Sequence, residues 1–266
     1  MSSKKLFLFD IDGTIIDGSR NMSEVSSKTK YAIKELAKDN YCFIASGRCK
    51  GLLDNQILAL GCNGYILCNG AYAEVNNEKI YEEFLDQEAV EQIIDCSIEK
   101  DGFYVLESLN RMFVNDVKAP KFIKFLQHWG QSIEKFENRN DLNHRYHVAM
   151  IGFNSEENCL YAEKRLQNYA TLLRHNGFKS YDVNIKGIDK GIGAKRVSEF
   201  LGISIDNTYC FGDGINDLEM LQAVGHPVIM ANADEKIKCY GFEETYDVLE
   251  DGVYRYLVDN KLIKPL

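Results

Sequence analysis

Two aspartates separated by one residue, Asp10 and Asp12, are the first side chains in the sequence with an evident chemical use. They follow a short apolar segment, residues 6–9, and precede a glycine. If the chain is locally extended, residues two apart project to the same side. One carboxylate can then attack a substrate as a nucleophile while the other moves a proton. Attack on phosphorus gives an aspartyl phosphate, which water then hydrolyses, so the pair is suited to phosphate ester chemistry.

Further carboxylates follow another segment that we expect to be a strand, residues 209–211, where the next six residues read Gly-Asp-Gly-Ile-Asn-Asp. Ligands bind beyond the carboxyl ends of the strands in open α/β sheets. Strands that share one sheet therefore bring four carboxylates to one edge, and these repel one another unless a cation neutralises them. The four are Asp10, Asp12, Asp213 and Asp217. Oxygen ligands without cysteine or histidine favour a hard ion, Mg²⁺.

A phosphoryl group needs partners for its other oxygens, and two further segments can supply them. Ser46 and Gly47 follow an expected strand at residues 42–45, so a hydroxyl group and backbone amides can bind phosphate at the same edge. Lys190 stands at the start of an expected helix, where free backbone amides add positive potential. Because phosphate monoester hydrolysis is very slow without a catalyst, we expect positioning and charge neutralisation to supply most of the rate.

The first 82 residues alternate between expected strands and helices. Three short continuous apolar runs, typical of strands covered on both faces, lie at residues 6–9, 42–45 and 65–68. Apolar residues recur at helical spacing between residues 25 and 37, with Ser23 as the expected N-cap, and another helix is expected from about Leu52. This alternation predicts an α/β fold with a doubly wound parallel sheet.

The pattern changes near residue 82 and returns after Gly187. In between, helices mix with adjacent strand pairs, which indicates an α+β module with an antiparallel sheet. Its expected strands are residues 103–106, 112–114, 146–153 and 181–185, and its expected helices are residues 88–98, residues 120–129 and a segment from residue 155. After Gly187 we expect helices at 191–200 and 217–223 and strands at 209–211 and 228–230. The sequence therefore predicts one core domain, residues 1–82 and 187–266, interrupted by a second domain at residues 83–186.

The sequence resembles the haloacid dehalogenase superfamily of phosphatases, and it is most similar to the Cof-like hydrolases. Residues 10–14, Asp-Ile-Asp-Gly-Thr, match the first motif of that family. Ser46 matches the second motif, Lys190 the third and residues 212–217 the fourth. The motifs occur in order, and the likeness covers essentially the whole chain. It implies a Rossmann-like core with a large cap domain between the second and third motifs, for which the 144 positions from Ser46 to Lys190 leave room.

The resemblance implies a role for each matching aspartate. Asp10 corresponds to the nucleophile and Asp12 to the general acid and base. Magnesium is held by the Asp10 side chain, the Asp12 backbone carbonyl and Asp213, while Asp217 supports the metal shell.

The resemblance also implies the groups that hold the substrate. Ser46 and Lys190 hold the phosphoryl group, and Asn216 hydrogen-bonds around the metal or the phosphate. Further residues that border the site in similar proteins, or that offer an amide to the phosphate, are Gly47, Arg48, Asn69 and Gly70.

The composition restricts the partners of the chain. Among 266 residues, 31 Lys and Arg against 40 Asp and Glu give a net charge of −9, which makes nucleic acid and acidic membranes poor partners. No apolar run approaches the ~18 residues of a spanning helix, and residues 6–9 are too few for a secretory signal. The 8 cysteines form no C-x-x-C pair. We expect a cytoplasmic protein that binds a small phosphorylated molecule; its oligomeric state is not indicated.

The leading hypothesis is a Mg²⁺-dependent phosphatase acting on a small phosphorylated metabolite such as a sugar phosphate. A phosphosugar mutase or other phosphotransferase is the near alternative, because phosphomannomutase-like proteins share the aspartate pair and a similar cap. A non-enzymatic phospho-acceptor, like a receiver domain, is an alternative of another class. Receivers are about half this length and have adjacent acidic residues, and both features argue against this alternative.

Overall fold

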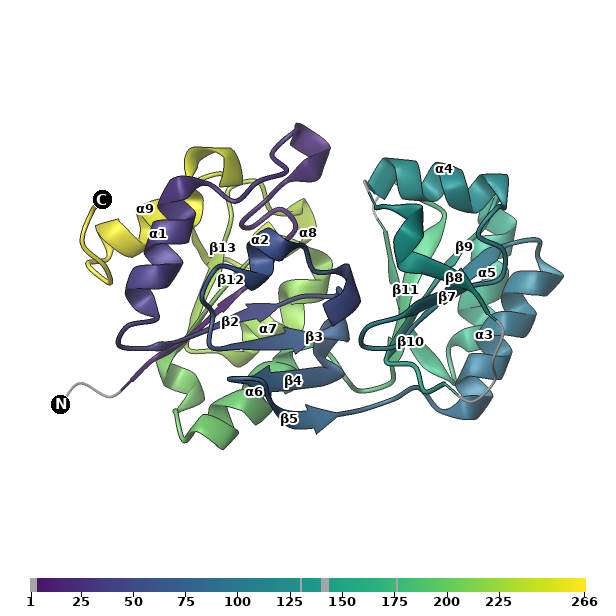
Figure 1. Ribbon diagram of the computed structural model, residues 1–266, viewed down its shortest axis with the longest axis horizontal. Helices are drawn as coiled ribbons and strands as arrows, with labels where there is room; N and C mark the ends of the chain where they lie inside the picture. The colour runs from purple at the N-terminus through teal and green to yellow at the C-terminus, as the bar shows by residue number, and fades with distance from the viewer. Residues whose placement is uncertain (1–3, 130, 140–143, 176) are drawn as a thin grey trace. The chain divides into compact units, whose positions relative to one another are not determined.

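The computed structural model describes residues 4–129, 131–139, 144–175 and 177–266 (Figure 1). The chain divides into two compact units. The first unit comprises Met1–Arg48, Leu53–Glu82 and Asp189–Leu266. The second comprises Cys49–Leu52 and Glu83–Ile188. Within the described residues, we find no helix with the length and apolar character that crossing a membrane requires.

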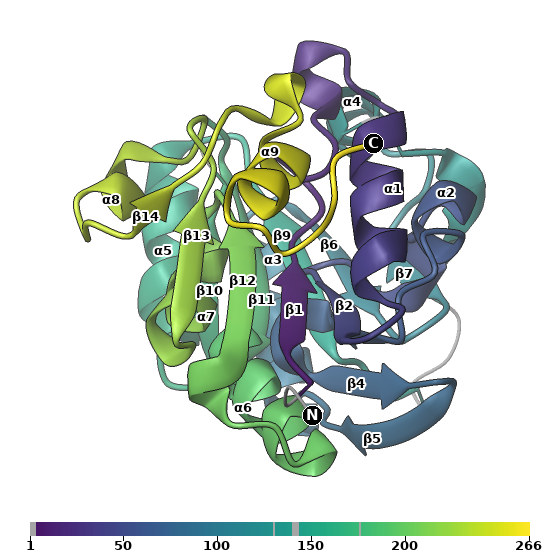
Figure 2. The same cartoon turned by 90° about the vertical axis from the view of Figure 1, so that its left-hand side faces the viewer.

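The first unit is built on an eight-stranded sheet in the order β14-β13-β12-β1-β2-β3-β4-β5. Its strands are β1 (Leu6–Phe9), β2 (Tyr41–Ala45), β3 (Gly64–Leu67), β4 (Tyr72–Val75), β5 (Glu78–Glu82), β12 (Thr208–Gly212), β13 (His226–Ile229) and β14 (Glu243–Glu244). Neighbours from β14 to β3 are parallel, whereas β4 is antiparallel to β3 and to β5. Figure 2 shows β13, β12, β1 and β2 side by side.

Helices cover both faces of this sheet, because the strands bury side chains on both sides. Leu8 of β1 packs with Val197 in one core cluster. On the opposite face Phe9 stacks on Phe211 with ring centroids 5.2 Å apart, and Phe211 meets Tyr256 edge-on at 5.3 Å. The helices are α1 (Ser27–Leu36), α2 (Asn55–Leu58), α6 (Lys190–Leu201), α7 (Leu218–Ala223), α8 (Glu235–Lys238) and α9 (Gly252–Asp259). The predicted doubly wound α/β core is therefore confirmed.

Two predicted helix starts in this unit are wrong. The N-cap of α1 is Ser26, not Ser23, and its hydroxyl accepts a hydrogen bond from the amide of Thr29 at 3.1 Å. The helix begins only at Ser27, so the residue directly before it is Ser26, and Ser23 lies three positions too early to cap it. Helix α2 begins at Asn55, and Leu52 instead ends a short 3₁₀ turn.

The β4–β5 hairpin is not among the elements predicted from the sequence. Its turn contains Asn76 and Asn77, whose φ angles of 48° and 66° are left-handed. Two such residues between strands are typical of a tight hairpin. The Asn-Asn pair is therefore the sequence feature from which this hairpin could have been predicted.

The second unit contains a six-stranded sheet in the order β10-β11-β9-β6-β7-β8. Its strands are β6 (Phe103–Glu107), β7 (Met112–Val114), β8 (Phe136–Asn138), β9 (Val148–Gly152), β10 (Ala170–Arg174) and β11 (Ser180–Ile185). Its helices are α3 (Gln87–Glu99), α4 (Pro120–Trp129) and α5 (Glu156–Leu166). All strand pairs are antiparallel except β7 with β8. The α+β character agrees with the sequence analysis, but the edge strands β8 and β10 were not predicted, because both carry exposed residues rather than apolar runs.

Alternate residues of β6 pack into separate core clusters on the two faces of this sheet. Tyr104 and Leu106 belong to the cluster that includes Cys96 of α3. Phe103 and Val105 belong to the cluster that includes Phe122 of α4. Helices α3 and α4 therefore lie on opposite faces.

The short segment Cys49–Leu52 belongs to the second unit, although the sequence analysis places it within residues 1–82. The amide of Gly51 donates a hydrogen bond to the carbonyl oxygen of Leu109 at 2.9 Å. The Lys135 ammonium donates to the carbonyl oxygen of Leu52 at 3.4 Å. The chain therefore contributes to the second unit immediately after Arg48.

Glu107, the last residue of β6, is a buried carboxylic acid of the second unit, with 4% of its surface exposed. Burial and then the nearby Asp182 raise the pKa of Glu107 to about 8, against a smaller lowering by a hydrogen bond with Cys49. At neutral pH the folded protein therefore keeps this group largely protonated.

This difference from the ordinary glutamate pKa of 4.5 makes stability depend on pH. The unfolded chain loses the proton first, so the stability present below pH 4.5 falls as the pH rises through about 8. We expect Glu107→Gln to remove this loss and to exceed the wild type in free energy of unfolding by about 5 kcal/mol at pH 9, because the pKa differs between 4.5 and about 8 and one unit corresponds to about 1.4 kcal/mol. Urea unfolding from pH 5 to 9 measures this difference in the free energy of unfolding. The matched control is Glu91→Gln, at an exposed position. If the free energies of unfolding of wild type and Glu107→Gln change with pH in parallel, the raised pKa of Glu107 is contradicted.

Candidate active site at the carboxyl ends of β1 and β12

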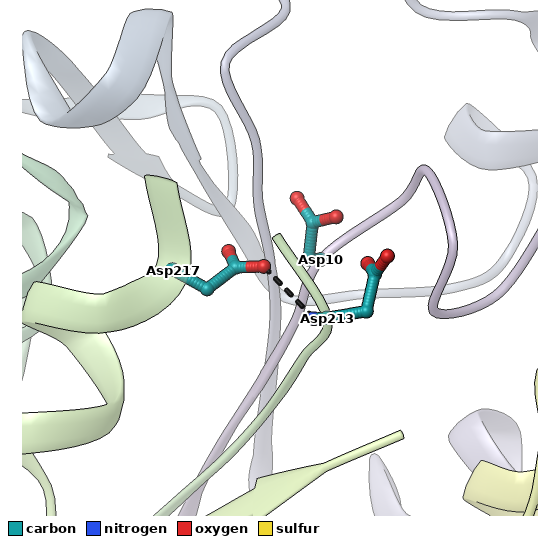
Figure 3. Close-up of side chains that lie close together, drawn as sticks. All are labelled: Asp10, Asp213 and Asp217. Atoms are coloured by element: carbon teal, nitrogen blue, oxygen red, sulfur yellow. Dashed lines mark hydrogen bonds between the residues drawn. The ribbon is translucent and has the colours of Figure 1, made fainter. Parts of the chain in front are cut away.

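Three aspartates come together where β1 and β12 end (Figure 3). The two strands are parallel with Phe9 opposite Phe211, and the amide of Asp10 donates to the Phe211 carbonyl oxygen at 3.0 Å. Asp213 follows β12, and Asp217 ends the next 3₁₀ turn. One carboxylate oxygen from each of Asp10, Asp213 and Asp217 lies within 4.8 Å of the others. The strand register thus brings together residues about 200 positions apart in the sequence.

Lys190, the first residue of α6, lies between two of these aspartates. Its side chain is completely buried, and its ammonium group donates to Asp10 Oδ1 at 2.6 Å and to Asp217 Oδ1 at 2.7 Å. Although burial by itself lowers the pKa of Lys190, the two carboxylates raise it above its ordinary value. The ammonium group therefore stays charged and holds both aspartates in place.

One lysine does not balance three carboxylates. Burial, followed by the charge of Asp217, raises the pKa of Asp10 to about 7. Burial and the charge of Asp10 raise the pKa of Asp213 well above its ordinary value. Buried carboxylates without enough counter-charge are the arrangement that a divalent cation stabilises. The all-oxygen donor set fits Mg²⁺.

Asp217 supports the loop that carries Asp213. Its Oδ2 accepts a hydrogen bond from the amide of Asp213 at 3.0 Å (Figure 3). The same oxygen accepts from the Gly214 amide at 3.0 Å, while Oδ1 accepts from Lys190. Both oxygens of Asp217 are therefore engaged by this chain.

Gly13 allows the segment that follows Asp10 to approach Asp213 closely. Its φ of +84° is left-handed, and an added Cβ would lie 2.0 Å from Asp213 Oδ2. Only glycine fits both conditions. The neighbouring Thr14 hydroxyl donates to Asp213 Oδ1 at 3.2 Å. Thr14 lies in the first motif, but no separate role is predicted for it from the sequence.

Asp12 lies outside the three-aspartate group, so the expected cluster of four carboxylates is reduced to three. Its side chain is 55% exposed and forms a two-point ion pair with Arg48. Arg48 Nε donates to Asp12 Oδ2 at 2.9 Å, and Nη2 donates to Oδ1 at 2.7 Å. Arg48, expected to border the site, therefore contacts the second aspartate directly.

The remaining candidate residues lie close together around the end of β2. Ser46 is 2% exposed, and its hydroxyl accepts from the Arg48 amide at 3.2 Å. The Asn69 amide donates to the Ser46 carbonyl at 3.2 Å, and Asn216 Nδ2 donates to Asn69 Oδ1 at 3.4 Å. A Cβ on Gly47 would lie 2.9 Å from that same Asn69 oxygen. The structure thus links the second-motif residues to Asn216 through Asn69.

Asn69 occupies a strained turn. It and Cys68 have left-handed φ angles of 50° and 54°, followed by Gly70 at 93°. A Cβ on Gly70 would lie 2.0 Å from the carbonyl oxygen of Asp189, the residue before Lys190. The turn therefore allows the start of α6 to pack directly against Asn69 and Gly70.

A family model described as haloacid dehalogenase-like hydrolase matches residues 7–257. The chain belongs to the haloacid dehalogenase-like hydrolases. YkrA of Bacillus subtilis (strain 168), which has a provisional phosphatase name, is 30% identical over 98% of this chain and 99% of its own length. YcsE of the same organism, named 5-amino-6-(5-phospho-D-ribitylamino)uracil phosphatase, is 24% identical over 94% of this chain and 92% of its own.

A solved structure agrees with this membership. The HAD subclass IIB sugar phosphatase BT4131 has a TM-score of 0.84 and 26% identity with this chain, covering 98% of this chain and 100% of its own. The resemblance identified from the four motifs is therefore confirmed, and this haloacid dehalogenase-like hydrolase is an enzyme.

The buried lysine allows a direct test of this hydrolase's electrostatics. We expect Lys190→Met to lower the free energy of unfolding by about 3–5 kcal/mol without added metal, because two buried carboxylates lose their partner. Lys195→Met, an exposed position of the same helix, is the matched control and should change it by less than about 0.5 kcal/mol. Urea unfolding in a metal chelator measures both variants. Equal stabilities for the two variants contradict the described charge balance.

Proposed function

We propose that this chain is a Mg²⁺-dependent phosphatase that hydrolyses a small phosphorylated metabolite, a sugar phosphate or a similar compound, through an aspartyl phosphate on Asp10. The observation that carries the proposal is the buried Asp10 carboxylate between Lys190, at 2.6 Å, and the nearby Asp213. A nucleophilic carboxylate, a fixed cation and surplus negative charge for a metal thus occur within one group.

In the proposed first step, an Asp10 carboxylate oxygen attacks phosphorus, and the bond from phosphorus to the substrate's ester oxygen breaks. Asp12 gives its proton to the departing alcohol. In the second step Asp12 takes a proton from water, which attacks the same phosphorus and releases inorganic phosphate and free Asp10. Lys190 neutralises part of the charge on Asp10 and the phosphoryl oxygens throughout.

The proposed metal site uses the side chains of Asp10 and Asp213 and the backbone carbonyl of Asp12, with Asp217 in support. When bound, Mg²⁺ supplies positive charge to the phosphoryl oxygens. Asp217 fits a supporting role, since its oxygens hold Lys190 and the backbone of the Asp213 loop.

The phosphate subsite is proposed to include Ser46, Gly47, Lys190, Asn216 and Asn69. Burial of Ser46 and the bond from Asn216 to Asn69 support a pre-arranged set of donors. These groups gather at the ends of strands, where an open α/β sheet binds its ligands.

Arg48 is proposed to control the second aspartate rather than to bind phosphate from the start. It holds both oxygens of Asp12. Because each carboxylate oxygen has a second lone pair, we propose that this ion pair orients Asp12 while leaving a position free for proton exchange with substrate.

The names of the relatives support a hydroxyl-rich substrate. BT4131 is named a sugar phosphatase, and the YcsE name specifies a phosphorylated ribityl group. The net charge of −9 supports a small molecule rather than nucleic acid as the partner.

The nucleophile assignment is tested by Asp10→Asn. We expect kcat for phosphate release to fall at least about a thousandfold, since an amide cannot replace the attacking carboxylate. The assay measures inorganic phosphate from a panel of sugar phosphates in Mg²⁺. The exposed position Asp39→Asn is the control, and wild type in a metal chelator should also lose activity until Mg²⁺ is restored. Substantial turnover by Asp10→Asn contradicts the proposed nucleophile.

Product analysis separates hydrolysis from phosphoryl transfer. With a hexose 1-phosphate and Mg²⁺, we expect free hexose and inorganic phosphate in equal amounts, because water is the final acceptor. Chromatography of the reaction with phosphate quantification measures both. A hexose 6-phosphate or bisphosphate as the main product instead identifies a mutase.

A further inference from the structure

The side chain of Asn232 joins two segments of the first unit that are distant in sequence. Asn232 lies in the loop between β13 and α8. Its Nδ2 donates a hydrogen bond to the carbonyl oxygen of Gly13 at 2.7 Å. Its Oδ1 accepts from the backbone amide of Val248 at 2.9 Å. Both ends of one amide group are therefore used, and one of them holds the loop that follows Asp10 and Asp12.

The backbone on both sides of the Gly13 Cα has little freedom. The Gly13 amide donates to the Ile16 carbonyl at 2.7 Å, while its Cα lies against the Asp213 carboxylate. The next residue, Thr14, donates from its hydroxyl to Asp213 Oδ1. The Gly13 carbonyl lies in the Gly13–Thr14 peptide group, and the Asp12 carbonyl lies in the adjoining Asp12–Gly13 group. A shift of the Gly13 carbonyl therefore strains the Thr14 contact to Asp213 and, through the Gly13 Cα, the peptide group that carries the Asp12 carbonyl.

The loop that carries Asn232 also holds the segment on the other side of the site. The amide of Met230 donates to the Gly212 carbonyl at 3.1 Å, and the amide of Asp234 donates to the Asp213 carbonyl at 2.9 Å. Asn232 stands between these two contacts in the chain. One loop thus fixes the backbone of Asp213 and, through Asn232, the backbone beside Asp12.

A second connection restrains the far end of the first-motif loop. Arg20 donates to both carboxylate oxygens of Asp247 at 2.9 Å, and Asp247 precedes the Val248 amide that Asn232 accepts from. Arg20 also pairs with Asp17 at 2.6 Å. The segment around Val248 is therefore itself anchored, which gives Asn232 a fixed support.

We propose that Asn232 is a positioning residue for phosphoryl transfer, which holds the Gly13 carbonyl so that the Asp12 backbone and Asp213 keep the spacing that Mg²⁺ requires. This inference rests on the proposed function. Asn232 touches no reacting atom in it. Groups that orient metal ligands typically change metal affinity or activity by 10–100-fold when they are removed.

The experiment compares Asn232→Ala, Asn232→Asp and a matched control. Asn63→Ala is the control, because the Asn63 side chain also bonds backbone, accepting from the Cys42 amide at 2.8 Å near the opposite end of β2. Calorimetric titration with Mg²⁺ alone gives the dissociation constant, and phosphate release at saturating Mg²⁺ gives kcat and KM. Urea unfolding reports whether each variant is folded.

For Asn232→Ala we expect a Mg²⁺ dissociation constant raised about tenfold or more and a kcat lowered about tenfold, with KM within about twofold of the wild type. Asn63→Ala should lose stability but keep Mg²⁺ affinity and kcat within about twofold. Asn232→Asp keeps the acceptor for Val248 and loses the donor to Gly13. Its added negative charge by itself favours cation binding, so weaker Mg²⁺ binding by this variant identifies a loss of geometry.

The inference is overturned if Asn232→Ala and Asn232→Asp both bind Mg²⁺ and turn over like the wild type. If Asn232→Ala does not fold, Asn232→Asp decides, and wild-type affinity and kcat in that variant again overturn the inference. A wild-type protein that neither binds Mg²⁺ nor releases phosphate removes the proposed function itself, which is a separate outcome.

Discussion

The geometry of the site depends on one completely buried ammonium group, that of Lys190. A buried ion pair adds little net stability, because the loss of hydration offsets the attraction. It does fix orientation, since neither Asp10 nor Asp217 can turn away without leaving a buried charge unpaired. The lysine neutralises only part of the negative charge, so Asp10 and Asp213 retain a strong demand for a further cation. Folding itself thus creates a charge imbalance that a bound cation would relieve.

The parallel register of β1 and β12 is what makes this charge cluster possible. A shift of one residue would turn Asp10 to the other face of the sheet, away from α6 and Lys190. The register is fixed by the apolar side chains of both strands, such as the stacked Phe9 and Phe211. Gly13 then permits a contact with Asp213 that no larger residue allows. The apolar packing that fixes the strand register therefore also fixes the positions of the charged groups.

Most of the core and the members of the site could be predicted from the sequence, because continuous apolar runs such as residues 6–9 mark buried parallel strands and because the motif residues directly follow them. Contacts between side chains could not be predicted. The pairing of Asp12 with Arg48 depends on side-chain directions, and Asn232 acts through a backbone carbonyl that leaves no pattern in the sequence. The edge strand β10 exposes several of its residues and so lacks an apolar signature. The roles of the site residues stay predictions until they are measured.

The four residues Cys49–Leu52 have a consequence for recombination of domains. They belong to the second unit, yet they directly follow Arg48, which forms an ion pair with Asp12. An added Cβ on Gly51 would lie 2.6 Å from the carbonyl oxygen of Asn110, so this segment and the β6–β7 turn are shaped for each other. A chimera that exchanges only the long insertion separates these matched surfaces. A transplant that preserves them has to carry both pieces of chain, with junctions at four points rather than two.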